Sequence, residues 1–314
     1  MTDRAKGIAA ITASAFGFAL MAACVRLADD YGGSVSSFQK SFFRNVVALL
    51  ISFAVFARKS HPSSLFLHLF WGLSPKNGGL SPYKRWGLSL KRWGLSSKSA
   101  GLLVLRSLLG TCGIFANFYA LGLVPIADGQ TLNKTAPFFT VLFAWLFLGE
   151  KASLRQIGVL LLAFAGVVFV AKPGFAGEAA FPLAMGLVGG ACAGGAYACV
   201  RALRKHAVEP AFIVVFFSAF SCLASVPFML ARFDPMTTAQ VAILFGAGAG
   251  AAIGQFGITL AYGYAAPRDI AVYDYSNILF TAAFGFLLFG QIPDVWSVLG
   301  FVLILAAAFR LHRT

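Results

Sequence analysis

Charged side chains are scarce in this sequence of 314 residues. Lys, Arg, Asp and Glu together make up 11% of the chain, hydrophobic residues make up 59%, and the mean hydropathy is +0.81. A soluble domain of this composition would have too little polar surface to cover its core. The composition therefore excludes a water-soluble globular protein and predicts an integral membrane protein.

Motifs that bind metals or nucleotides are also missing from the sequence. The four histidines lie outside the long apolar runs, and the five cysteines lie within them without Cys-x-x-Cys spacing. Neither arrangement is typical of a metal site or of a disulfide framework. Nothing resembles a P-loop, so ATP is not expected to drive the protein directly. We expect no metal, no cofactor and no catalytic residues.

The apolar residues gather into ten runs, each near the roughly 20 residues that an α-helix needs to cross the hydrocarbon core of a membrane. The runs are 7–28, 36–57, 100–123, 127–148, 154–171, 182–203, 210–231, 240–264, 270–289 and 295–311. Alternating strand patterns of a membrane barrel are absent from the sequence. Since helices are the remaining way to satisfy the backbone in lipid, we predict an all-α integral membrane protein with ten transmembrane helices.

Lys and Arg are concentrated in the loops that share one side of the membrane with both chain ends. Loops on the other side hold few of them, namely Arg26, Lys172 and Arg232, with Lys40 near the edge. The positive-inside rule then predicts an inner-membrane protein with both termini in the cytoplasm. The net charge of +14 is thus a topology signal, and no nucleic-acid partner is expected.

The two halves of the sequence repeat one another. The segment Ala23-Cys24-Val25-Arg26 recurs as Ala198-Cys199-Val200-Arg201. Further identities follow at a constant offset, including Gly113/Gly254, Asp128/Asp269, Thr140/Thr281 and Gly149/Gly290. We therefore predict two five-helix repeats, residues 1–173 and 174–314. Because five is odd, the second repeat must be inverted relative to the first, and inverted repeats build transporters that bind their substrate between the halves.

Residues 60–99 interrupt the first repeat and have no counterpart in the second. The segment Gly-Leu-Ser recurs along this insert, mostly after Trp, together with several basic residues. Two interpretations remain open. The insert is either a passive low-complexity loop or a basic, Trp-containing segment that contacts anionic membrane lipid.

Four ionisable side chains fall inside the predicted spans, where burial in hydrocarbon is costly and usually marks a functional site. Arg44 lies in the second span, Arg106 in the third, Lys134 in the fourth and Asp274 in the ninth. Arg106 is close enough to the cytoplasmic end to be an interfacial anchor instead. We predict that Arg44, Lys134 and Asp274 border one cavity.

The repeat alignment places polar groups at the same depth in two spans, because Asn133 and Lys134 align with Asp274 and Tyr275. On regular helices, a spacing of three or four residues would put such groups on one face. These are Gln130 and Lys134 in the fourth span, and Tyr273, Asp274 and Asn277 in the ninth. The full set of predicted substrate-binding residues is Arg44, Arg106, Asn117, Gln130, Asn133, Lys134, Tyr197, Gln255, Tyr262, Tyr273, Asp274, Tyr275 and Asn277.

Several short segments, spread over nearly the whole chain except 60–99, carry a family resemblance. They are Phe43-Arg44-Asn45, Arg106-Ser107-Leu108-Leu109-Gly110, Tyr119-Ala120-Leu121 before Pro125, Pro137, Leu148-Gly149-Glu150-Lys151 and Phe289-Gly290-Gln291. In these segments the chain resembles the ten-helix EamA-type members of the drug/metabolite transporter superfamily. Such proteins usually carry Glu at the position of Gln291. The resemblance implies two inverted repeats around a central cavity and transport of small metabolites such as amino acids, often as export.

We therefore expect a secondary transporter, not an enzyme, that exports a small organic metabolite by alternating access. Arg44 and Lys134 would meet a carboxylate or phosphate, and Asp274 an amine or a coupled proton. One alternative is an importer of a nucleotide-like metabolite such as S-adenosylmethionine, which some similar proteins transport. The others are a channel and, less favoured, a membrane-embedded enzyme. Both a monomer and a homodimer remain open.

Overall fold

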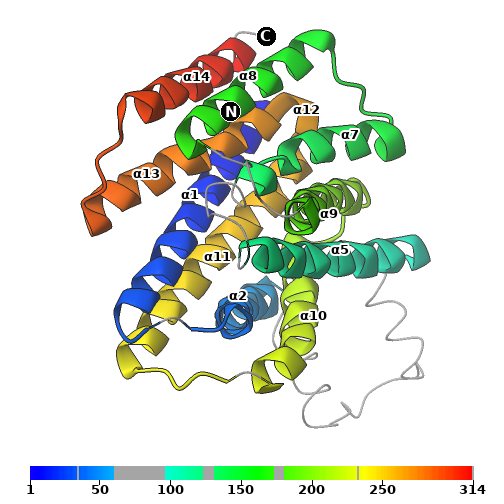
Figure 1. The fold of residues 1–314 in the computed structure, drawn as a ribbon. Helices are drawn as coiled ribbons and strands as arrows, with labels where there is room; N and C mark the ends of the chain where they lie inside the picture. The colour runs from blue at the N-terminus through cyan, green and yellow to red at the C-terminus, as the bar shows by residue number, and fades with distance from the viewer. Residues whose placement is uncertain are drawn as a thin grey trace, which may run out of the picture.

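The computed structural model describes residues 1–33, 35–59, 96–121, 123, 131–172, 180–231 and 233–312. Within these ranges the secondary structure is helical, without a strand (Figure 1). Of the insert predicted at 60–99, only 96–99 is described. Helix α5 already begins at Ser97, so the third span starts slightly earlier than predicted.

The helices follow the predicted apolar runs. The first half holds α1 (Asp3–Asp30), α2 (Ser37–Lys59), α5 (Ser97–Leu121), α7 (Ala136–Leu148) and α8 (Leu154–Ala171). The second half holds α9 (Ala180–Lys205), α10 (Pro210–Ala231), α11 (Thr238–Tyr264), α12 (Pro267–Ile270), the 3₁₀ helix η1 (Ala271–Tyr275), α13 (Ser276–Phe289) and α14 (Val295–His312). Among the described residues, nine stretches are long and apolar enough to cross a membrane, and α14 supplies a shorter apolar helix. The predicted all-α membrane fold with ten spans is confirmed.

Two of the predicted spans are interrupted. In the fourth, the chain turns at Lys134 and Thr135, and α7 begins only at Ala136. Pro137 lies in the first turn of α7, where its missing N–H removes no intrahelical hydrogen bond. In the ninth, η1 separates α12 from α13. The prediction of regular helices over 127–148 and 270–289 is therefore wrong at these points, because hydropathy does not detect a local change to 3₁₀ or turn geometry.

The two interrupted spans end in the same way. Helix α7 ends at Gly149 with φ 69°, and α13 ends at Gly290 with φ 63°. This left-handed conformation favours glycine and closes the last turn of a helix. The residues that follow, Glu150 and Gln291, are thereby placed at equivalent positions at opposite ends of the bundle.

The most extensive helix contacts join the two sequence halves. Helix α1 packs along α11, α5 along α9, α2 along α10 and α8 along α14 (Figure 1). A Cβ built on Gly17 would lie only 2.6 Å from the backbone nitrogen of Gly254, so α1 and α11 approach closely. Close contacts of this kind between small residues hold membrane helices together. The two sequence repeats are therefore interleaved in space.

Candidate functional site

A cavity of about 1170 Å³ lies in the centre of the bundle. Its walls come mainly from α1, α2, α5, α8, α9, α13 and the interrupted segments before α7 and α13, and α10, α11 and α14 also contribute residues. At one end it reaches the tips of the helices, where it is bordered by Arg26, Asp29, Lys40, Lys172 and Asp294. None of the described residues at the opposite helix tips lines it. The cavity therefore opens towards one side of the bundle.

Arg44 from α2 and Arg106 from α5 form a pair of cations in this cavity. Arg106 is 1% exposed, and its guanidinium stacks on the Phe217 ring with 3.5 Å between the Cζ atom and the ring centroid. Its Nη2 donates to Gln255 Oε1 at 2.7 Å. Its Nε and Nη1 are buried without a hydrogen-bond partner, as is the Nε of Arg44. These N–H groups are available to an acceptor in the cavity.

Lys134 and Asp274 lie in the two interrupted segments and face the same cavity. Lys134 Nζ donates to Asn277 Oδ1 at 2.5 Å, and Asn277 Nδ2 donates to the Ala15 carbonyl at 2.9 Å. Lys134 and Asp274 are close enough to interact electrostatically. The Tyr275 hydroxyl donates to the Lys134 carbonyl at 3.1 Å, a backbone group that lies outside the regular helix. Interrupted helices around a central site are typical of transporters.

The structure brings most of the predicted site residues to this cavity. Besides the four charged residues they are Asn117, Asn133, Tyr197, Gln255 and Asn277. The buried Oδ1 of Asn117 has no partner and can accept a hydrogen bond from a substrate N–H or O–H group. Tyr197 also lines the cavity, near enough to both arginines and to Asp274 to interact electrostatically with each.

Three predicted tyrosines do not line the cavity. Tyr262 is 1% exposed and belongs to the apolar core formed with α1 and α9, and Tyr275 is fully buried. The Tyr273 hydroxyl donates to the Ala308 carbonyl of α14 at 3.1 Å. Tyr273 lies in the 3₁₀ helix η1 and bonds α14, whereas the prediction placed it with Asp274 and Asn277 on one face of a regular α-helix. Gln130 lies outside the described residues.

Sequence reasoning missed the charged residues at the open end of the cavity. Lys40 Nζ contacts Asp29 Oδ2 at 2.7 Å, and Lys172 forms an ion pair with Asp294. Hydrogen bonds from Lys172 and Ser297 lower the pKa of Asp294 to about 2. The acid lies 11 residues away for Lys40 and 122 residues away for Lys172, in both cases on another segment, so neither pair has a helical i, i+4 signal in the sequence.

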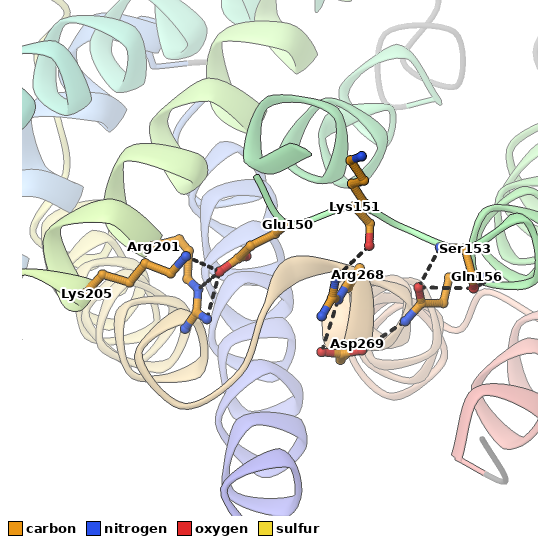
Figure 2. A network of polar contacts seen from close by, with 8 residues as sticks. All are labelled: Glu150, Lys151, Ser153, Gln156, Arg201, Lys205, Arg268 and Asp269. Atoms are coloured by element: carbon orange, nitrogen blue, oxygen red, sulfur yellow. Dashed lines mark hydrogen bonds and ion pairs between the residues drawn. The ribbon is translucent and has the colours of Figure 1, made fainter. Parts of the chain in front are cut away.

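The opposite end of the bundle is closed by a charged contact (Figure 2). Glu150 Oε1 accepts from Arg201 Nε at 2.9 Å and lies 2.6 Å from Lys205 Nζ. Arg201 Nη1 also donates to the Tyr262 carbonyl of α11 at 3.0 Å. Burial alone would raise the pKa of Glu150, but the hydrogen bonds and charges of Arg201 and Lys205 lower it below its usual value. This contact joins α7, α9 and α11.

A second set of polar contacts lies beside it and links the α7–α8 connection and the first turn of α8 to α12 (Figure 2). Gln156 Nε2 donates to Asp269 Oδ1 at 2.9 Å, and Arg268 Nη1 donates to the Lys151 carbonyl at 2.6 Å. The Arg4 guanidinium donates to the Leu311 carbonyl, and Leu311 borders the same small pocket as Gln156 and Arg268, so both chain ends lie on this side. The closed end of the cavity is thus the end that carries the termini.

Arg26, the repeat counterpart of Arg201, lies at the open end. Its guanidinium is 4.7 Å from the centroid of the Phe289 ring. With the Gln291 amide oxygen turned towards it, both terminal nitrogens donate at 2.8 Å. Among the described residues, Arg26 has no bond to α5 that would match the bond of Arg201 to α11. The two repeat-related arginines therefore differ in their contacts. Arg201 joins helices across the closed end, and Arg26 lines the cavity at the open end.

Comparison with known proteins agrees with this architecture. The model of the EamA-like transporter family matches residues 5–172. The pseudopaline exporter CntI of Pseudomonas aeruginosa is 32% identical, over 68% of this chain and 75% of that protein. A riboflavin transporter of Rhizobium johnstonii is 28% identical, over 66% of this chain and 68% of its own length. A solved structure titled only "Crystal structure of protein" shares the fold at a TM-score of 0.70, with 17% identity and 97% of each chain covered. The relatives indicate a multi-pass membrane transporter with a small-molecule substrate, and not an enzyme.

Proposed function

Because the chain belongs to the EamA-like transporter family, we propose that it is a secondary transporter that exports a small organic metabolite such as an amino acid. The observation that carries the proposal is the cavity that brings Arg44, Arg106, Lys134 and Asp274 together. Charges at this depth in a membrane are costly unless they meet a ligand, one another or water. A metabolite with an anionic or zwitterionic group would supply the partners that the arginines lack.

The direction and the orientation belong to the same proposal. The similarity to the pseudopaline exporter supports export. The Lys and Arg distribution supports an inner-membrane protein with both termini in the cytoplasm. In that orientation the cavity opens outwards, and the contact of Glu150 with Arg201 closes it towards the cytoplasm.

The repeat-related arginines suggest how the two ends alternate. Arg201, held by Glu150, bonds the last turn of α11 at the closed end. Arg26, held by Gln291, borders the open end. In the opposite state Arg26 would contact α5, the repeat counterpart of α11, while Arg201 releases Tyr262. The exchange closes one end as the other opens, which is alternating access.

The units that move follow from the packing. Helices α11 and α13 each pack against α1, and their repeat counterparts α5 and α7 each pack against α9. Each trio includes helices from both sequence halves. A rocking motion of one trio against the other would open the cavity at alternate ends without breaking the contacts within each trio.

The function can be tested with cells that express the protein and a metabolite profile of their medium. At least one organic acid or amino acid should accumulate outside cells that express the wild type. Lys134→Ala and Asp274→Asn should each reduce its accumulation to the level of empty-vector cells at equal expression. Lys6→Ala, at an exposed site outside the cavity, serves as the control and should export normally. Equal medium profiles for wild-type and empty-vector cells would contradict the proposal.

A further inference from the structure

The inner part of the cavity carries more positive than negative charge. Its described charged residues are Arg44, Arg106 and Lys134 against Asp274, and three cations less one carboxylate leave a formal charge of +2. The charged residues at the open end do not offset this excess. There Lys40 pairs with Asp29 and Lys172 pairs with Asp294, and Arg26, which contacts the uncharged Gln291, adds one more positive charge. No acid at the open end therefore neutralises the excess of two positive charges at the deep site.

This excess is located at the arginine pair. Lys134 already donates to Asn277 and lies near Asp274. Arg44 donates no hydrogen bond to any described residue, and Arg106 uses only one of its three nitrogens. Arg106 is fully buried and Arg44 is partly buried with its Nε enclosed. Buried N–H groups of a cation are costly when they are unpaired, and the acceptors that match a guanidinium best are carboxylate and phosphate oxygens.

The stacking of Arg106 on Phe217 does not supply these partners. The ring covers one face of the planar guanidinium, at 3.5 Å. The N–H groups point outwards in the plane of the guanidinium, so stacking leaves them free to bond. Gln255 accepts a hydrogen bond from Nη2, and Nε and Nη1 have no acceptor. Phe217 and Gln255 thus fix the orientation of Arg106 but leave two of its nitrogens without a hydrogen-bond acceptor.

We infer that the transported metabolite carries two negative charges, as a dicarboxylate or a phosphate monoester does, and that Arg44 and Arg106 together bind its anionic oxygens. This inference rests on the proposed function, because it places the substrate in the same cavity. Tyr197, Asn117, Asn133 and Asp274 line the same cavity as the two arginines. These polar groups are the ones that the remainder of the substrate would contact.

Two matched pairs of probes test the charge requirement on the purified full-length protein. O-phosphoserine and serine O-sulfate have nearly the same shape but differ by one charge at neutral pH, and glutarate and its monoamide differ in the same way. Binding is measured by thermal shift and by calorimetry. In each pair, the dianion should bind at least about tenfold more tightly than the monoanion.

The pH dependence gives a second test that needs no variant. The second pKa of a phosphate monoester is about 6. O-phosphoserine should therefore bind more weakly at pH 5.5 than at pH 7.5, whereas the arginines and the sulfate ester keep their charges over this range. If O-phosphoserine and serine O-sulfate lost affinity equally at pH 5.5, the titrating group would belong to the protein and the inference would be overturned.

Variants of the pair assign the site. Arg44→Gln and Arg106→Gln should each lose dianion binding at least about tenfold, and Arg44→Lys should retain part of it because it keeps the charge. Lys6→Gln removes an exposed charge outside the cavity and should bind as the wild type does. The inference fails if the monoanions bind as well as the dianions, if no dianion binds, or if binding survives both Gln variants.

These results are separable from the proposed function. Export that depends on Lys134 without any dianion binding would leave the transporter standing and remove this substrate class. Dianion binding that depends on Arg44, in cells that export nothing, would retain the anion site and remove the transporter.

Discussion

At the scale of single residues, Arg106 depends on a glycine one turn further along α5. A Cβ built on Gly110 would lie 2.7 Å from Cε2 of Phe217 and 3.0 Å from Nη1 of Arg106. Both neighbours are held in place, Phe217 by its burial and Arg106 by its bond to Gln255. A methyl group at this position would therefore have to displace the guanidinium from its stack.

We expect Gly110→Ala to lower the stability of the protein by about 1–3 kcal/mol, as overpacking of a rigid site does, and to weaken binding of the dianionic probe. Gly101→Ala is the matched control on the same helix, because no atom lies within 4 Å of its added Cβ. Melting curves of the two purified variants compare them directly. Equal melting temperatures and equal probe binding would contradict the assigned role of Gly110.

Sequence alone identifies some of these residues and not others. Arg44, Lys134 and Asp274 could be predicted because a charge in an apolar run is rare and costly. The tyrosines carry no such signal, since an apolar ring with a polar tip suits both a core and a cavity. Tyr197 lines the cavity and Tyr273 does not, and only the three-dimensional placement of α9 and η1 distinguishes them.

At the scale of helices, the ends of α7 and α13 differ in one chemical respect. Glu150 can carry a charge, and its counterpart Gln291 cannot. The carboxylate is nearly buried and contacts Arg201 and Lys205. Since its pKa is lowered in the folded protein, its stabilisation is fully present above the usual carboxyl range and is lost as the pH falls through the lowered value. The closed end should therefore weaken in acid.

Glu150→Gln should open the closed end at neutral pH, because Arg201 loses the charge that holds it against α11. A coupling of about 1–3 kcal/mol corresponds to a shift of about 5- to 150-fold between the two states. Cys199 lies two residues before Arg201 and is 8% exposed, so it reports on opening. The measurement uses a protein that keeps only this cysteine, with an impermeant thiol reagent applied to inside-out vesicles. Cys199 should be labelled faster in the Glu150→Gln variant than in the protein with Glu150 intact.

Asp3→Asn is the control for this measurement. Asp3 pairs with Lys6 on the same side of the bundle, but both side chains are exposed, and such pairs contribute little. Its labelling rate should equal that of the protein with Asp3 intact. If Glu150→Gln labels no faster than this control, Glu150 does not hold the closed end.

The helices themselves are the part of the fold that sequence predicts best. Long apolar runs fix where a chain can cross a membrane, and the described helices follow these runs closely. The turn at Lys134 and the 3₁₀ segment η1 escape a hydropathy pattern, because a few residues of altered backbone hardly change the average over a span. The site lies at these interruptions, so its exact geometry could not be predicted.

At the scale of the whole molecule, the duplication in sequence does not give two bodies in space. The pairs α1–α11, α2–α10, α5–α9 and α8–α14 each join one half to the other. Close backbone contact, as between Gly17 and Gly254, depends on the partner helix being present. A half expressed alone would expose these small-residue faces to lipid, which cannot replace the lost packing contacts.

We therefore expect residues 1–173 and 174–314, expressed as separate chains, to be unstable alone and to assemble into one complex when they are co-expressed. The cut falls between α8 and α9, so every helix stays intact, and a tag on one half should co-purify the other. A cut between Gly250 and Ala251 is the control, because it divides α11 in its middle and should prevent assembly. The complex should also recover dianion binding, since Arg44 and Asp274 reach the cavity from different halves. Two halves that are each monodisperse in detergent, and that do not associate, would show that the interleaved packing is not what stabilises the protein.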